Sequence, residues 1–210
     1  MKKSMLVLTV ALLLAALVPK PSAAAVDLGI KGGVSLSSYQ WTGEDPSSRL
    51  TSPVFGVFFT LNLNRTFAIQ PEVYYLTHGG TELWELDTTT YKYVDRYNYI
   101  HVPILAKVRL MPDKKLTPII FAGPAMGVLL SAHYKYFVDD VEEYDEDIKA
   151  YLKKTNFSIV FGAGVEYKMD KYMLILDIRY DLGLANIDGS NDPTDTLKTR
   201  ALMFMVGVGF

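Results

Sequence analysis

The stretch Thr199-Arg-Ala-Leu-Met-Phe-Met-Val-Gly-Val-Gly-Phe210 closes the chain and decides the expected fold. At alternate positions, one side of this stretch is wholly apolar, with Leu202, Phe204, Val206, Val208 and Phe210. The other side is small or flexible, with Ala201, Met203, Met205, Gly207 and Gly209. A two-residue period predicts a β-strand. An edge strand this apolar favours aggregation in water, whereas lipid covers one face of a membrane-barrel strand, so we expect the closing strand of a barrel.

The N-terminus has the parts of a secretory signal peptide. Two lysines precede an apolar run from Met5 to Val18, and small residues lead up to Ala25. This run is shorter than the roughly 20 apolar residues that a membrane-spanning helix needs, so we expect cleavage after Ala25. The sequence therefore predicts a signal peptide at residues 1–25 and one barrel domain at residues 26–210.

The composition excludes several classes of protein. The chain has no cysteine, which rules out a lipoprotein anchor, disulfides, thiolate metal sites and cysteine nucleophiles. Without Lys2, Lys3 and Lys20, the 21 basic residues fall to 18 against 23 acidic ones, and the net charge changes from −2 to −5. A mildly acidic exported domain is a poor nucleic-acid binder, so we expect no nucleic-acid partner.

The alternation of apolar and polar residues recurs in seven segments before the closing strand. The connections between segments alternate in length: long and polar at 40–52, 78–90, 135–154 and 183–198, and short at 64–66, 111–115 and 169–171. In an up-and-down barrel, every long loop then lies at one end and every tight turn at the other. Outer-membrane barrels have this pattern, with long loops outside the cell. The sequence predicts an all-β, eight-stranded antiparallel up-and-down transmembrane β-barrel in a Gram-negative outer membrane.

Aromatic residues recur at both ends of the apolar faces. Phe67 and Tyr75 are eight residues apart, as are Tyr172 and Tyr180. Eight steps of about 3.3 Å at a tilt of about 40° span roughly 20 Å, close to the apolar band of about 25 Å between aromatic girdles. We expect two girdles that include Phe67, Tyr75, Phe157, Tyr167, Tyr172 and Tyr180.

The opposite faces of the same strands collect charged residues. The set is Lys31, Glu72, Lys107, Arg109, Glu166, Asp177, Arg179 and Asp181. Charges that face lipid are costly, so we expect these side chains in the lumen. The interior of an eight-stranded barrel is just wide enough for side chains to fill it. The favoured interpretation is a network of paired charges that plugs the lumen, and the alternative is a conduction pathway.

Histidines and clustered acids raise the question of catalysis or metal binding. The histidines are His78, His101 and His133, and we expect the first and last near the outer loops. No nucleophile elbow or His-Glu-x-x-His spacing accompanies them, so we expect no enzyme, cofactor or metal site. The acidic run 139–147 offers the carboxylates that divalent cations prefer, but it lacks an EF-hand pattern. A solvated face is the simpler interpretation, and cation binding stays open.

Six segments, in order, carry a family likeness: Gly29-Ile-Lys-Gly-Gly-Val-Ser-Leu-Ser, Ala68-Ile-Gln-Pro-Glu-Val-Tyr-Tyr, Tyr99-Ile-His-Val-Pro-Ile-Leu-Ala-Lys, Phe121-Ala-Gly-Pro, Gly162-Ala-Gly-Val-Glu-Tyr and Asp177-Ile-Arg-Tyr-Asp-Leu-Gly-Leu-Ala-Asn-Ile. With them the chain resembles the PorT-like outer-membrane β-barrel family of Bacteroidota-type envelopes. The resemblance implies an eight-stranded barrel similar to OmpX and OmpA, and one type of member is linked to type IX secretion. The chain departs from the family at His101, where an acidic residue is frequent.

The expected role is structural, adhesive or partner-binding, through four outer loops above a side-chain-filled lumen. The alternatives are a small-solute pore, a PorT-like secretion component, or a soluble lipocalin-like binder. Expected partners are outer-membrane lipids, an extracellular or envelope protein and the barrel-assembly machinery. By resemblance to other outer-membrane barrels, that machinery reads the terminal Phe210 as an assembly signal.

Overall fold

The computed structural model describes residues 26–190 and 195–210, which form nine strands and a short 3₁₀ helix. The elements are β1 (Val26–Trp41), β2 (Ser48–Asn62), β3 (Phe67–Leu86), β4 (Thr89–Arg109), β5 (Leu116–Val138), β6 (Val141–Asp147), η1 (Lys149–Tyr151), β7 (Thr155–Lys168), β8 (Met173–Gly183) and β9 (Leu197–Gly209). The expected signal peptide, residues 1–25, lies outside the described part. Within that part, no helix is long and apolar enough to cross a membrane.

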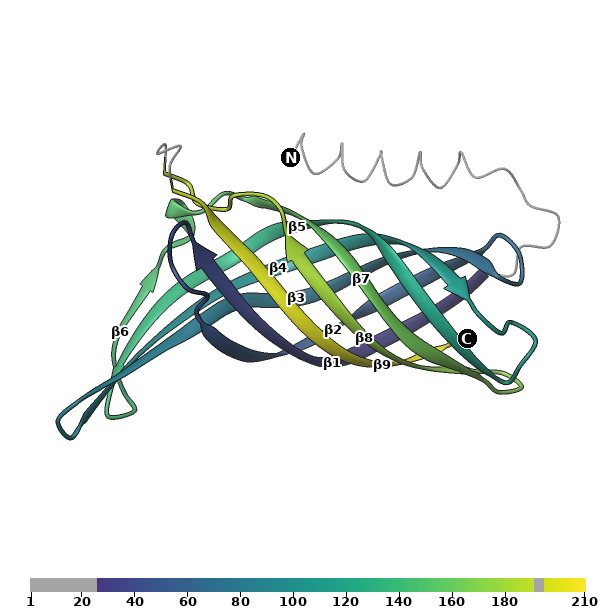
Figure 1. The fold of residues 1–210 in the computed structure, drawn as a ribbon, viewed down its shortest axis with the longest axis horizontal. Coiled ribbons are helices and arrows are strands. Elements are labelled where there is room, and N and C mark those ends of the chain that lie inside the picture. Colours follow the sequence, from purple (N-terminus) through teal and green to yellow (C-terminus); the bar gives the residue numbers. More distant parts are fainter. Residues whose placement is uncertain (1–25, 191–194) are drawn as a thin grey trace.

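Eight of the strands close into a ring (Figure 1). Each strand pairs antiparallel with its neighbours in the order β1, β2, β3, β4, β5, β7, β8 and β9, and β9 returns to β1. Strand β6 pairs with β5 alone and stands outside the ring. The prediction of an all-β, eight-stranded up-and-down barrel is therefore confirmed.

The closing strand has the two faces that its alternation predicts. Phe204 and Val206 are exposed on the outer wall, whereas Met203 and Met205 are buried in the lumen. The seam ends in two backbone hydrogen bonds, because Phe210 N–H donates to Leu28 O (2.8 Å) and Leu28 N–H donates to Phe210 O (3.1 Å). The terminal residue thus belongs to the β1–β9 ladder that closes the ring.

The predicted loops at 78–90 and 135–154 are wrong in large part, because the strands continue through them. Strand β3 runs to Leu86 and pairs with β4 residue by residue, and β5 runs to Val138 before turning into β6. Apolar alternation is weak in these segments, as expected where a sheet extends past the lipid-facing wall of a barrel. Their ladder hydrogen bonds and cross-strand aromatic pairs extend the sheet all the same.

Aspartates make the two tight turns of these extended hairpins. Asp87 has a φ of 55°, and Asp139 and Asp140 have φ of 49° and 62°. In the Asp139-Asp140 turn both central residues have positive φ, which suits the right-handed twist of the flanking strands, whereas in the other turn Asp87 alone does; Asp tolerates this conformation. The outer parts of β3, β4 and β5, together with β6, form a sheet that projects past the ring at the end opposite the C-terminus (Figure 1). We call it the outer sheet.

A short cover lies over the outer mouth of the barrel. Leu152 and Asp188 form an isolated β-bridge, and Lys153 N–H donates to Ile187 O (2.8 Å). Leu152 and Ile187 are buried against lumen residues such as Tyr97 and Leu129. The mouth is therefore closed by apolar packing.

Candidate functional site

Seven of the eight predicted lumen charges form two clusters of ion pairs. The cluster nearer the short turns joins β4 to β7 across the lumen. Lys107 Nζ lies 2.6 Å from Glu166 Oε1, and Arg109 Nε lies 2.7 Å from Glu166 Oε2. Arg109 Nη1 also donates to Asn62 Oδ1 (2.8 Å). A single carboxylate thus holds two cations, and both of its oxygens are engaged.

The central cluster balances two cations with two carboxylates. Lys31 Nζ lies 2.8 Å from Asp177 Oδ2 and 3.1 Å from Glu72 Oε1. Arg179 lies 2.5 Å from Glu72 and 2.9 Å from Asp177, and its guanidinium also packs over the ring of Phe121 at 5.0 Å. All four charged side chains are buried, so each depends on the others to replace lost hydration.

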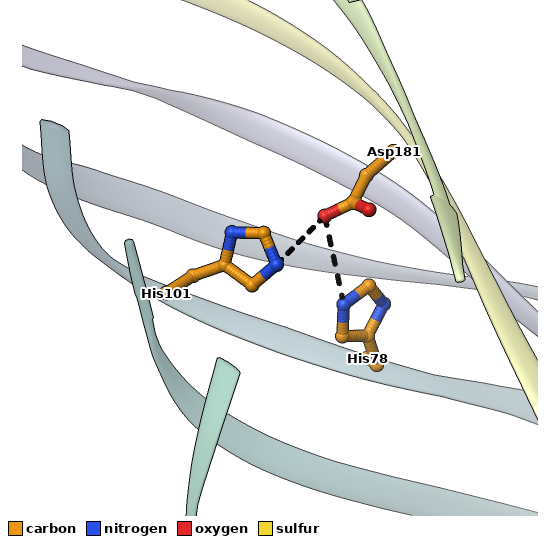
Figure 2. A group of neighbouring side chains, drawn as sticks. All are labelled: His78, His101 and Asp181. Carbon is orange, nitrogen blue, oxygen red and sulfur yellow. Dashed lines mark ion pairs between the residues drawn. The ribbon is translucent and has the colours of Figure 1, made fainter. Parts of the chain in front are cut away.

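The eighth charge, Asp181, makes no ion pair with the cations of these clusters and lies beside two histidines (Figure 2). His101 Nε2 is 3.0 Å and His78 Nε2 is 3.9 Å from Asp181 Oδ2, and all three side chains are 0 % exposed. The residues come from β3, β4 and β8. Sequence reasoning missed this group because it placed His78 in a loop. The sequence signal that could have placed Asp181 was the two-residue alternation along β8, since Asp181 lies on the same inward face as Asp177 and Arg179.

The histidine group does not have the geometry of a nucleophilic triad. Ser158 Oγ lies 3.4 Å from His101 Nε2, the same nitrogen that faces Asp181. A triad histidine takes a proton from the nucleophile at one ring nitrogen and is oriented by the acid at the other. A shared nitrogen cannot serve both roles, and the group is also sealed from solvent.

Apolar clusters fill the lumen between and above the charged groups. Near the histidines, Val54, Tyr74, Leu76, Met203 and Met205 pack together. Another cluster contains Leu105, Ile119, Phe121, Ala125 and Val160. The outermost consists of Tyr39, Tyr97, Tyr99, Leu129, Ala132, Leu152, Ile187 and Leu197. Side chains thus occupy the lumen at several levels, including its outer mouth.

The predicted girdle residues lie on the outward side of the strands. Phe67, Phe157, Tyr167 and Tyr172 are exposed on the outer wall. Tyr75 stacks on Phe55 and Tyr180 packs against Phe161, so both are half-buried. Their contact with the membrane interfaces stays a prediction.

The outer sheet carries a ladder of aromatic rings. Tyr93 and Tyr136 stack with centroids 4.8 Å apart, and Trp84 meets Tyr93 edge-on at 5.5 Å. Tyr91 stacks on Tyr136 at 6.3 Å, and Tyr134 stacks on Tyr93 at 5.7 Å. We call these five residues, on β3, β4 and β5, the aromatic ladder. By register, these five residues lie on the same side of the strands as the residues that face the lumen within the ring.

Carboxylates lie at the foot of the aromatic ladder. The Tyr39 hydroxyl is 2.8 Å from Asp95 Oδ2 and 3.2 Å from Glu82 Oε1. Asp95 pairs with Tyr134 and lies five residues along β4 from Ile100, the register partner of the predicted outer-girdle residue Tyr75, so we place it outside the membrane-spanning part. Burial raises the pKa of Asp95 from 3.8 to about 6, although hydrogen bonds from Tyr39 and Tyr97 oppose the rise.

The acidic run 139–147 forms a turn and the edge strand β6. Its carboxylates are partly neutralised by β5, because Lys135 Nζ lies 2.8 Å from Glu142 Oε2 and 3.0 Å from Asp145 Oδ2. His133 Nδ1 lies 2.9 Å from Asp145 Oδ1. Within the described residues, this run does not bring three ligand groups around one point. Cation binding there stays an open prediction.

The closed ring, the apolar outer wall and the polar lumen together define a transmembrane β-barrel. Residues 19–189 match the family described as outer membrane protein beta-barrel domain, and the chain belongs to this family. The protein is therefore located in the outer membrane, as predicted. The resemblance to the PorT-like family stays a prediction.

Solved barrels of three kinds are similar in fold. Neisserial surface protein A has 12 % identity and a TM-score of 0.47, over 87 % of this chain and 95 % of that one. The attachment invasion locus protein Ail of Yersinia pestis has 12 % identity and a TM-score of 0.45, over 88 % and 98 %. OprG of Pseudomonas aeruginosa has 14 % identity and a TM-score of 0.45, over 89 % and 95 %. No curated protein sequence matches the chain.

Proposed function

We propose that the protein is an outer-membrane barrel that binds a protein partner outside the cell through the outer sheet. The observation that carries this proposal is the aromatic ladder, which stands beyond the barrel rim with Trp84 57 % exposed. Tyr and Trp dominate binding hot spots because they bury large rigid surfaces at low entropic cost. Five such rings lie together on a sheet that projects past the ring of eight strands.

Charge indicates the chemistry of the partner. Glu82 and Asp95 lie at the foot of the aromatic ladder, and the acidic edge strand β6 lies beside it. Arginine and lysine bind both to carboxylates and over aromatic faces, and opposite charge steers association. We infer that the partner presents a basic segment rich in arginine.

The filled lumen supports a structural role for the barrel rather than transport. Ion pairs and apolar clusters occupy it at successive levels, and the buried histidine group lacks the nucleophile–base geometry of a hydrolase. The pore and the enzyme are therefore the less favoured functions. A PorT-like role in secretion gains no support from a particular site and is not proposed.

Trp84 provides a direct assay of partner binding. The sequence has two tryptophans, so Trp41→Phe leaves Trp84 as the sole tryptophan reporter on the aromatic ladder. In lipid nanodiscs, we expect an arginine-rich peptide to change Trp84 fluorescence, and salt to weaken the effect. Combined Tyr93→Ala and Tyr136→Ala substitutions should weaken binding at least tenfold, about 1.4 kcal/mol.

Leu83→Ala is the matched control. Leu83 is 59 % exposed and lies on β3, the strand of Trp84, but on the face opposite the aromatic ladder. It should leave peptide binding unchanged. An equal response to an acidic peptide of the same length, or an undiminished response in the double-tyrosine variant, would contradict the proposed binding face.

A further inference from the structure

We propose that His78, His101 and Asp181 form a binding site for a divalent first-row transition metal ion, with Zn²⁺ the best fit. The three residues converge from β3, β4 and β8 on one point in the lumen (Figure 2). One ligand atom from each residue lies within 4.8 Å of the others. Donor atoms around a tetrahedral zinc ion are about 3.3 Å apart, so small rotamer adjustments bring all three into coordination.

Unpaired polar atoms distinguish this group from an ordinary buried ion pair. The contact of His101 with Asp181 (3.0 Å) accounts for one ring nitrogen. Both nitrogens of His78 and Nδ1 of His101 are buried without a hydrogen-bond partner among the described residues. Buried polar side chains are seldom left unpaired, and such groups call for a bound water or ion. A metal ion engages one nitrogen from each histidine at once.

The donor set selects the class of ion. Two imidazoles and one carboxylate suit zinc and its first-row neighbours, whereas Ca²⁺ and Mg²⁺ take oxygen ligands almost alone. Three protein ligands leave a fourth position for water. Ser158 Oγ, 3.4 Å from His101 Nε2, lies close enough to contact such a water.

A bound ion connects strands that are not neighbours in the ring. Strand β8 pairs with β7 and β9, whereas β3 and β4 pair with each other on another part of the wall. Coordination therefore links opposite walls of the barrel beneath the apolar cover. The ion would cross-link β8 to β3 and β4 and so stabilise the outer half of the barrel against separation of these strands.

The surroundings predict modest affinity and slow exchange. Metal-bound histidines usually donate their second N–H to a carboxylate or carbonyl, and loss of such support costs about 10–100-fold in affinity. His78 packs edge-on against Tyr99 at 5.6 Å, and His101 lies against Tyr74 at 5.1 Å, so rings rather than acceptors surround them. The packed cover makes loading during folding the easier route.

The test measures metal retained by the untagged protein. Protein purified from outer membranes is unfolded in urea with a chelator, then refolded in detergent with excess Zn²⁺ or Co²⁺ and separated from free metal. We expect about one zinc ion per chain, and with cobalt the visible absorption of a four-coordinate site. Zinc should also raise the midpoint of urea unfolding, because it binds the folded state alone.

His78→Gln and Asp181→Asn should each lower the retained zinc at least about tenfold. His133→Gln, which makes the same change at an exposed histidine paired with Asp145, should retain zinc as the wild type does. Heat-modifiable gel mobility reports folding of each variant, and Asp181→Asn keeps the volume of the side chain if His78→Gln fails to fold. The cobalt spectrum of the wild type depends on no variant.

Three results would overturn the proposal: a wild-type barrel that retains no zinc and shows no four-coordinate cobalt, folded variants that retain it as the wild type does, or loss of zinc in His133→Gln alone. In the first case, the nitrogens are satisfied by water. In the third, the metal sits at the acidic edge of the outer sheet.

Discussion

Arg179 illustrates how buried charges depend on one another in this lumen. It contacts Glu72 and Asp177 from the same guanidinium, and it is 1 % exposed. Its planar fork matches two carboxylates with fixed geometry, which the single ammonium of Lys31 cannot reproduce. Removing one partner of a buried ion pair is therefore costlier than the net contribution of the pair.

We expect Arg179→Met to lower the free energy of unfolding by about 3–5 kcal/mol, because two buried carboxylates then share only Lys31. Urea titration in detergent, followed by tryptophan fluorescence, measures the change. Arg65→Ala is the control. Arg65 pairs with Asp113 on the surface, where the two side chains are 84 % and 74 % exposed, so this substitution should change stability little. Equal stability of the two variants would show that the central cluster does not hold the barrel together.

Asp95 makes the foot of the aromatic ladder sensitive to pH. Its pKa is about 6 in the folded protein and 3.8 in the reference state, so the folded state binds the proton more tightly. Stability therefore falls as the pH rises from about 4 to about 6 and levels off above that. The carboxylate is buried against Tyr39 and Tyr97, with Glu82 nearby.

Hydrogen exchange of the outer-sheet amides at pH 4.5 and 7.5 tests this. We expect weaker protection at the higher pH in the wild type, after correction for intrinsic exchange rates. Asp95→Asn, which keeps an acceptor for Tyr39, should remove most of the difference and raise protection at pH 7.5. A variant that keeps the full pH dependence would assign the effect to another group.

At the scale of elements, the closing strand shows what one terminal residue adds. Phe210 completes the β1–β9 ladder with two hydrogen bonds to Leu28 and is 61 % exposed on the outer wall. Both features suit a residue that anchors the seam at the membrane interface. Recognition of Phe210 by the assembly machinery stays a prediction, and it would add a kinetic role to this structural one.

We expect deletion of Phe210 to reduce the amount of barrel in the outer membrane several-fold in cells, while refolding in detergent changes little. Immunoblots of membrane fractions and heat-modifiable mobility measure the two effects separately. Phe210→Tyr, which keeps a terminal aromatic, is the matched control and should assemble normally. Normal membrane levels of the truncated chain would remove the assembly role.

The extended hairpins show where local sequence reading falls short. A two-residue period identifies a strand when lipid covers one face and the lumen the other, as in β9. In the outer sheet, polar residues occupy much of both faces, so the apolar period weakens and is kept mainly by alternate aromatics such as Tyr91 and Tyr93, although the backbone still pairs. Contacts such as Tyr93–Tyr136 join residues 43 positions apart, and no local pattern reports them.

For the whole molecule, the filled lumen predicts the absence of steady conduction. Charged clusters, apolar clusters and the cover at Leu152 and Ile187 leave side chains at successive levels of an eight-stranded ring. Planar-bilayer recordings should show no stable conductance steps, with a porin of larger strand number as the positive control. A stable open level that persists over minutes would favour the small-solute pore.

The sequence by itself determined the ring of eight strands, the outward and inward faces, and seven lumen charges that pair across the barrel. It did so because lipid and lumen impose opposite chemistry on alternate residues, and that period is local. Only the tertiary structure brought His78 and His101 beside Asp181 and assembled the aromatic ladder. Those groups depend on strand register and on closure of the barrel, which bring residues from distant strands to the same level along the barrel axis. The sequence of a single strand does not determine that level.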